Sequence, residues 1–134
     1  IEKKITVLGY LITAPDLAGI LRAIRLENAG QRLVIEYQNG RVLRFSVEGD
    51  CCSRSWIEHL ESIPDVDGAT VLSVEEAVGD VKPGEDLSQF DCLQVYETRI
   101  HTDRGTITME YRNDSNGYYG GNIVFEGEDP PVRV

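Results

Sequence analysis

The sequence is poor in basic side chains. It has 13 lysines and arginines against 23 aspartates and glutamates, which gives a formal net charge of −10. A surface with so few cations attracts neither nucleic acid nor an anionic membrane, so neither is expected as a partner. No signal peptide is expected, and the sequence has no apolar run long enough to span a bilayer. An acidic protein can still bind an anionic small molecule, but only through a local cluster of arginines, and solubility is the commonest reason for a charge of this size.

Cysteine is scarce as well, with three in the chain. Cys51 and Cys52 are adjacent, and adjacent cysteines bridge only through a strained ring, while an odd number leaves one thiol free. A disulfide framework is therefore excluded, and a reducing compartment, the cytoplasm, is expected.

The chain is expected to form one domain, residues 1–134. With 134 residues and 41% hydrophobic composition, it is long enough to bury a core of its own. The apolar N-terminal stretch, residues 1–14, is expected to be a loose arm or a first strand. The acidic tail, residues 127–134, is expected to fray.

Alternating apolar and polar residues predict β-strands over most of the chain. Between residues 21 and 47 the alternation is interrupted at Asn28–Ala29–Gly30 and at Asn39–Gly40, which predicts a three-stranded meander. Asn-Gly is a strong hairpin signal because both central residues of the favoured turn need positive φ. Further strands are expected over residues 69–78, 92–102, 106–111 and 122–125. Residues 79–90 predict a surface loop that can move.

One stretch, Asp50–His59, departs from this pattern and predicts a helix running to about Leu60. With Ser55 at the N-cap, Glu58 falls at the third helical position, which is the capping-box spacing. Trp56, His59 and Leu60 would then share one helix face. The predicted fold class is therefore α+β: a mainly antiparallel sheet of six or seven strands, with one main helix packed against it.

The same stretch gathers reactive side chains. Cys51 or Cys52 would sit just before the helix N-terminus, which favours the thiolate, and His59 could serve as a base for a cysteine-dependent enzyme. The commoner alternative is that both cysteines are small hydrophobes packed beneath Trp56. Spacing identifies no residue that would orient the histidine, and zinc would require the distant Cys92 to converge without any CxxC motif. We expect a structural role for this motif, no catalytic residue, no metal and no cofactor.

A second candidate site is the segment Tyr111–Gly121. It combines a guanidinium, amides, the pair Tyr118–Tyr119 and several glycines, which suits a planar polar ligand because rings stack and arginine binds phosphate. The alternative is an ordinary turn, since Asn-Asp-Ser-Asn-Gly is rich in turn residues. If neighbouring arginines from elsewhere in the chain join this segment, they supply the local positive charge. The predicted ligand-binding set is Arg54, Arg104, Arg112, Asn113, Asn116, Tyr118 and Tyr119.

The motifs Asp50-Cys51-Cys52-Ser53, Trp56-Ile57-Glu58-His59 and Ser115-Asn116-Gly117-Tyr118-Tyr119 occur in that order, with Gly68-Ala69, Val74-Glu75-Glu76 and Arg104-Gly105 between them. Over residues 42–125 the sequence resembles a family of small phage and prophage proteins of unknown function. More distantly, it resembles phage anti-defence proteins that sequester a cyclic ADP-ribose signal of the Thoeris system. It departs from them at Glu110, which stands near the place of a basic residue.

The more distant resemblance implies a non-enzymatic, oligomeric protein that holds a nucleotide-derived signal without cleaving it. The leading prediction is therefore a phage-encoded binding protein in the cytoplasm of an infected or lysogenic bacterium, with a cyclic nucleotide or ADP-ribose-type ligand. The alternative is an acidic interaction module that inhibits a host protein or imitates the charge of DNA. A cysteine-dependent enzyme is the third reading.

Overall fold

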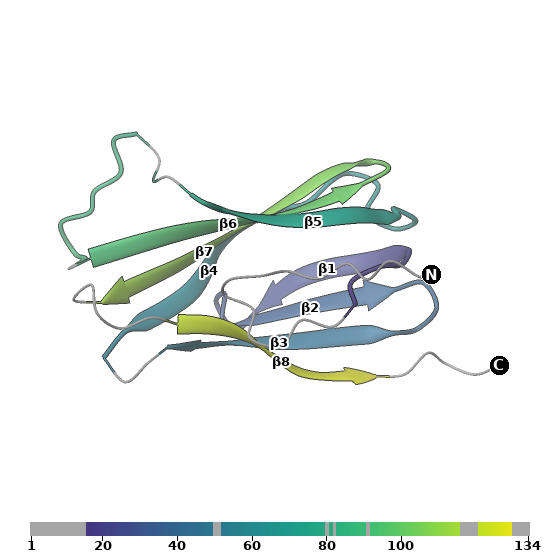
Figure 1. Ribbon diagram of the computed structural model, residues 1–134, viewed down its shortest axis with the longest axis horizontal. Helices are drawn as coiled ribbons and strands as arrows, with labels where there is room; N and C mark the ends of the chain where they lie inside the picture. Colours follow the sequence, from purple (N-terminus) through teal and green to yellow (C-terminus); the bar gives the residue numbers. More distant parts are fainter. Residues whose placement is uncertain are drawn as a thin grey trace.

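The computed structural model describes residues 16–49, 52–79, 81, 83–90, 92–115 and 121–129. Within these residues the regular structure is entirely β, and eight antiparallel strands form two four-stranded sheets (Figure 1). The first sheet has the order β1-β2-β3-β8 and the second the order β4-β7-β6-β5. The strands are β1 Leu21–Glu27, β2 Arg32–Tyr37, β3 Val42–Gly49, β4 Arg54–Glu61, β5 Val71–Val78, β6 Cys92–Thr102, β7 Gly105–Ser115 and β8 Gly121–Asp129.

The predicted α+β class is wrong, because the segment expected to be helical is strand β4. It pairs with β7 along its length, and a bulge between Ile57 and His59 inserts one extra residue. The bulge brings Ile57 and Leu60 onto the same face, opposite Tyr111 and Met109. The bulge also keeps Trp56 and His59, three residues apart, on one face, as the predicted helix would have done. Leu60, which was expected on that face as well, lies on the opposite one.

The predicted meander over residues 21–47 is confirmed as β1, β2 and β3, and its first turn has positive φ at Asn28, Ala29 and Gly30. The second turn differs in detail, because Gly40 alone takes a positive φ and Asn39 does not. Gly40 donates to the carbonyl of Tyr37, and Tyr37 donates to that of Arg41. This is a three-residue hairpin loop that ends on a glycine, rather than the two-residue Asn-Gly turn.

The two sheets lie face to face, and the core fills the space between them (Figure 1). Alternate residues of β2 and β3 point inward, and they meet inward residues of β4, β6 and β7. The buried apolar side chains of the core are Leu17, Leu21, Leu33, Ile35, Tyr37, Leu43, Phe45, Val47, Ile57, Val71, Ile100, Ile107, Met109, Tyr111 and Ile123.

Backbone hydrogen bonds join the two sheets near β1. At one end, Leu21 donates to Ala69 and Gly68 donates to Leu21, at 2.8 Å each. At the other end, the Ile57 N–H donates to the Gly30 carbonyl at 2.9 Å, so the β1–β2 turn lies on the edge of β4. This contact covers part of an otherwise open strand edge and fixes the turn relative to β4.

Several expectations fall at the limits of the described residues. The expected N-terminal arm lies outside them, as does most of the expected tail, although residues 127–129 belong to β8. No helix among the described residues is long and apolar enough to cross a membrane.

Candidate functional site

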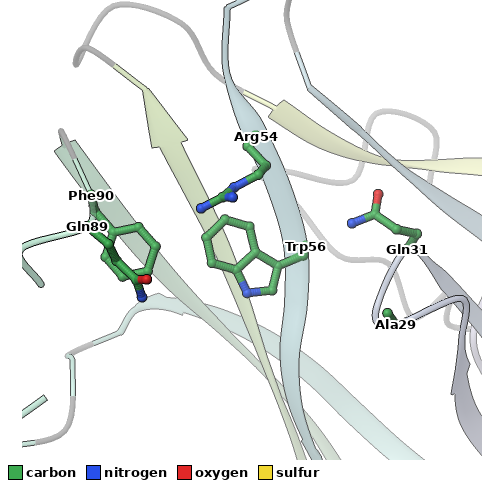
Figure 2. A pocket seen from close by; sticks show the side chains of 6 residues that line it. All are labelled: Ala29, Gln31, Arg54, Trp56, Gln89 and Phe90. Carbon is green, nitrogen blue, oxygen red and sulfur yellow. The ribbon is translucent and has the colours of Figure 1, made fainter. Parts of the chain in front are cut away.

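A pocket of about 320 Å³ lies on the outer face of the second sheet, the face turned away from the first sheet. It is lined by Ala29, Gln31, Arg54, Trp56, Gln89 and Phe90. Figure 2 shows the indole of Trp56 at the centre, with Phe90 and Gln89 on one side and Gln31 and Ala29 on the other. The volume is at the lower end of the range typical of small-ligand sites.

Strand β4 supplies the centre of this pocket. Arg54 and Trp56 are two residues apart, so both side chains leave the strand on the outer face. The Arg54 guanidinium lies 5.1 Å from the centre of the Trp56 ring, close enough for a cation–π contact. The indole Nε1–H donates to the Glu58 carboxylate at 2.5 Å, which holds the ring in place.

The β1–β2 turn supplies one wall. Gln31 donates from Nε2 to the Ser55 carbonyl at 2.9 Å, and this bond ties the amide to β4. Ala29 has φ of 52°, a left-handed conformation that costs a non-glycine residue about 1 kcal/mol or more. The hydrogen bond between Ile57 and the neighbouring Gly30 stabilises the turn in this strained conformation. Strained backbone of this kind is frequent at binding sites.

Residues 83–90, here called the covering segment, supply the opposite wall. They lie on the side of the second sheet away from the first (Figure 1). The Phe90 ring stacks on Trp56 with centroids 5.9 Å apart and planes inclined by 26°. Phe90 donates its N–H to the Leu87 carbonyl at 3.0 Å. The aromatic end of this predicted surface loop therefore packs on the second sheet.

Arg112 lies beneath the covering segment and not in the open pocket. Its side chain is 2% exposed, with Nε bound to Glu110 at 2.8 Å and Nη2 bound to Glu85 at 2.9 Å. Burial by itself lowers the pKa of Arg112, but the hydrogen bonds to Glu85 and Glu110 outweigh it and raise the pKa above its ordinary value. The guanidinium is therefore charged, and two carboxylates neutralise it.

Asn113 lies on the inner face of β7, away from Arg112. It is 1% exposed and its Nδ2 donates to the Ser55 hydroxyl at 3.3 Å, while Oδ1 accepts no hydrogen bond from the described residues. The backbone of Gly121 lies close to the same hydroxyl, since a Cβ on this glycine would be 2.1 Å from it. Asn113 is thus part of the packing between the sheets, on the opposite face from Trp56.

Arg104 is not brought near the other arginines. It occupies the β6–β7 turn, where its Nη1 donates to the Asp67 carbonyl at 2.9 Å. Eight residues of extended strand, about 26 Å, separate it from Arg112. The structure thus places Arg54 and Arg112 on one face at one end of the second sheet and Arg104 at the other end. Asn116, Tyr118 and Tyr119 lie outside the described residues.

The predicted cysteine chemistry depended on a helix after Cys52, whose N-terminus would favour the thiolate, but residues 54–61 form strand β4. Cys52 is exposed just before β4, and Cys51 lies outside the described residues. His59 is five residues along β4 from Arg54, about 17 Å away if fully extended, so it is not a base for Cys52. Among the described residues, no group of three or more His, Cys, Asp or Glu side chains could hold a metal ion.

Comparison with known proteins gives a family for the chain. A family model for a domain of unknown function (DUF7448) matches residues 6–125. The chain belongs to the DUF7448 family. The matched region of this DUF7448 domain contains all six residues that line the Trp56 pocket. A search of the curated proteins and a search of the solved structures found no match.

Of the six residues that line the pocket of this DUF7448 domain, only Arg54 was predicted to bind a ligand. Trp56 was expected to be structural, and the others were not predicted as site residues: Ala29, Gln31, Gln89 and Phe90. Phe90 carried a usable signal, because a large aromatic ring at the end of a polar loop needs a surface on which to pack. Nothing in the sequence placed that loop beside Trp56, since the contact joins residues far apart along the chain.

A separate polar cluster on the second sheet gives a test of its strand register. His101 Nε2 lies 2.6 Å from Glu75 Oε1, and its Nδ1 lies 2.9 Å from the Thr106 hydroxyl. The hydrogen bond with His101 is the main cause that lowers the pKa of Glu75, and Arg99 adds to it.

We therefore expect the Glu75 carboxyl to titrate below its ordinary pKa in the folded domain. Because the lowered pKa belongs to the folded state, this carboxylate stabilises the fold above its unfolded pKa, and the contribution is lost as the pH falls through the folded pKa. His101→Val should move the Glu75 pKa upward in an NMR titration. An unchanged value in that variant would contradict the pairing of β5 with β6.

Proposed function

We propose that this DUF7448 domain is a non-enzymatic binding protein for a small planar, nucleotide-like ligand, held in the Trp56 pocket. The observation that carries the proposal is the Trp56–Phe90 ring pair beside Arg54, whose side chain is 67% exposed. The amides of Gln31 and Gln89 border the same pocket. Aromatic rings, amides and one guanidinium are the groups with which proteins recognise a base and its phosphate.

The two rings pack against each other, so a ligand between them requires Phe90 to move away from Trp56. A planar ring inserted between them needs roughly 7 Å between the two ring planes, which is two contact distances of about 3.5 Å. A ligand inserts between the rings after Phe90 moves, or it stacks on the exposed part of the indole. Either mode keeps Trp56 as the main contact.

The charges around the pocket indicate that stacking contributes more affinity than electrostatic attraction. Arg54 is offset by Glu58, which binds the indole, and by Asp114, whose Oδ2 lies 3.9 Å from Arg54 Nη2. A pair at that distance on an exposed side chain contributes little. We therefore expect the wild-type domain to bind an uncharged nucleoside and its monophosphate with similar affinities.

Trp56→Ala is expected to weaken nucleotide binding by about 1–3 kcal/mol, roughly fivefold to 150-fold, because it removes the stacking surface. Calorimetry with a panel of nucleosides, mononucleotides and cyclic ADP-ribose-type compounds measures the loss, and Trp56→Tyr should retain part of the affinity.

A matched control for this experiment is Leu72→Ala, which truncates a 55% exposed apolar side chain on β5, outside the residues that line the pocket. It should bind as the wild-type domain does. If no compound in the panel binds the wild-type domain or raises its unfolding temperature, the proposed function is refuted, since binding to the native state alone must stabilise it.

For the biological role, we propose that the domain sequesters a nucleotide-derived signal. The support is the sequence resemblance to phage anti-defence proteins, from which phage origin, cytoplasmic location and assembly into homo-oligomers are also expected. The acidic interaction module remains the second candidate, supported by the net charge of −10. It would be favoured if the nucleotide panel fails and one host protein binds the domain in a salt-sensitive manner.

A further inference from the structure

We infer that Arg112 forms a second, covered anion subsite of the Trp56 pocket, and that the Glu85 carboxylate occupies it in place of a ligand phosphate. This inference rests on the proposed function and deepens it. It names the phosphate group of a nucleotide as the chemical group that the subsite takes. It also gives the covering segment a role in selecting between charged and uncharged ligands.

The first support is the position of Arg112 beside Trp56. The two residues are direct partners across the β4–β7 pair, so their side chains leave the same face, with Cβ atoms about 5 Å apart. Arg54 is on the same face, two residues along β4 from Trp56. The indole therefore has one guanidinium along its own strand and another across the sheet, within reach of a phosphate attached to a stacked base.

The second support is the way in which Arg112 is held. Glu110, on the same strand, binds Nε at 2.8 Å and leaves Nη2 directed at the covering segment, where Glu85 binds it at 2.9 Å. The guanidinium is thus oriented by one carboxylate and covered by another. Since arginine binds carboxylate and phosphate with the same planar set of donors, Glu85 fills a place suited to a phosphate.

The third support is that the Glu85 carboxylate makes few hydrogen bonds in this position. Its Oε1 accepts from Arg112, but its Oε2 is buried and accepts no hydrogen bond from the described residues. A buried carboxylate oxygen without a donor loses its hydration and regains little. The side chain remains 25% exposed, so a rotation into solvent would release Arg112 without separating β4 from β7.

The test uses the full chain and two probes, adenosine and adenosine monophosphate. Glu85→Gln keeps the size of the side chain but removes the competing charge. It should raise the affinity for the monophosphate about tenfold, by restoring a charge-assisted bond to Arg112, and leave the affinity for adenosine unchanged. Glu85→Ala should act in the same direction. Calorimetry gives both affinities, and thermal unfolding verifies that each variant folds.

The matched control is Asp86→Asn. It removes one negative charge from the adjacent position, and Asp86 binds within the covering segment, to the Ser88 N–H at 2.9 Å. This variant should leave the monophosphate-to-adenosine ratio unchanged. If Asp86→Asn raises the ratio as much as Glu85→Gln does, the effect is one of overall charge, and the subsite is refuted.

The remaining outcomes separate this inference from the proposed function. If both probes bind through Trp56 but Glu85→Gln leaves the ratio of their affinities unchanged, the subsite is refuted. The proposal that the Trp56 pocket binds the base is then unaffected. An equal gain for both probes would show that Glu85 only restricts access to the ring, which also refutes the subsite. If neither probe binds the wild-type domain or either variant of Glu85, both proposals fail together.

Discussion

Replacing Gly30 with alanine is expected to destabilise the domain by about 3 kcal/mol and to weaken ligand binding. Gly30 has φ of 83°, and a Cβ there would lie 2.2 Å from the Ile57 carbonyl oxygen, which is backbone and cannot move aside alone. The positive φ costs an alanine about 1–2 kcal/mol. Moving the turn off β4 also breaks the Ile57–Gly30 hydrogen bond, for about 1 kcal/mol more. Urea unfolding measures the change in the free energy of unfolding.

Gly84→Ala is the matched control for this prediction. Gly84 has φ of 82°, nearly the same backbone conformation, but a Cβ there would meet nothing within 4 Å. Its cost should be that of the positive φ alone, about 1–2 kcal/mol. The difference between the two variants isolates the contact of the β1–β2 turn with β4. Equal losses would show that the turn does not lie against β4 as described.

Arg112→Met should also cost about 3 kcal/mol of unfolding free energy. Methionine fills much of the same volume, but Glu85 and Glu110 lose the charge that neutralises them, and uncompensated buried charges are strongly destabilising. The loss should be at the lower end of the range for buried pairs, because Glu85 can turn toward solvent. Thermal and urea unfolding provide the measurement.

Restoring neutrality should recover most of the stability lost in Arg112→Met. The triple variant that adds Glu85→Gln and Glu110→Gln removes all three charges together and should unfold with a free energy close to that of the wild-type domain. If the triple variant is no more stable than Arg112→Met alone, the loss comes from packing rather than from charge, and the ion cluster described here is not what holds Arg112.

The strands were predictable where alternation was regular. Residues 92–102 were expected as a strand and form β6 with the same bounds, and the meander of residues 21–47 was found from its turns. Periodicity alone could not exclude a helix over Ser55–Leu60, since a bulged strand places residues three apart, such as Trp56 and His59, on the same face as a helix does. Pairing with β7, which depends on residues some fifty positions later, overrides the capping pattern.

The candidate site was predictable only in part. Arg54 was expected at a ligand, and it lines the pocket, whereas Trp56 was expected to be structural. Arg112 was expected to be free for phosphate, but Glu85 and Glu110 neutralise it. Sequence spacing could not show this, because Glu85 reaches Arg112 from a loop 27 residues earlier in the chain.

The most direct test of the Trp56 pocket uses the indole as its own reporter. Trp56 is the sole tryptophan of the chain, so one indole N–H resonance and one fluorescence signal report on the pocket. Titration of the wild-type domain with adenosine should shift that resonance and change the fluorescence saturably, with the same dissociation constant by both signals. An indole resonance and fluorescence that stay unchanged, while nucleotides bind elsewhere or not at all, would contradict the account.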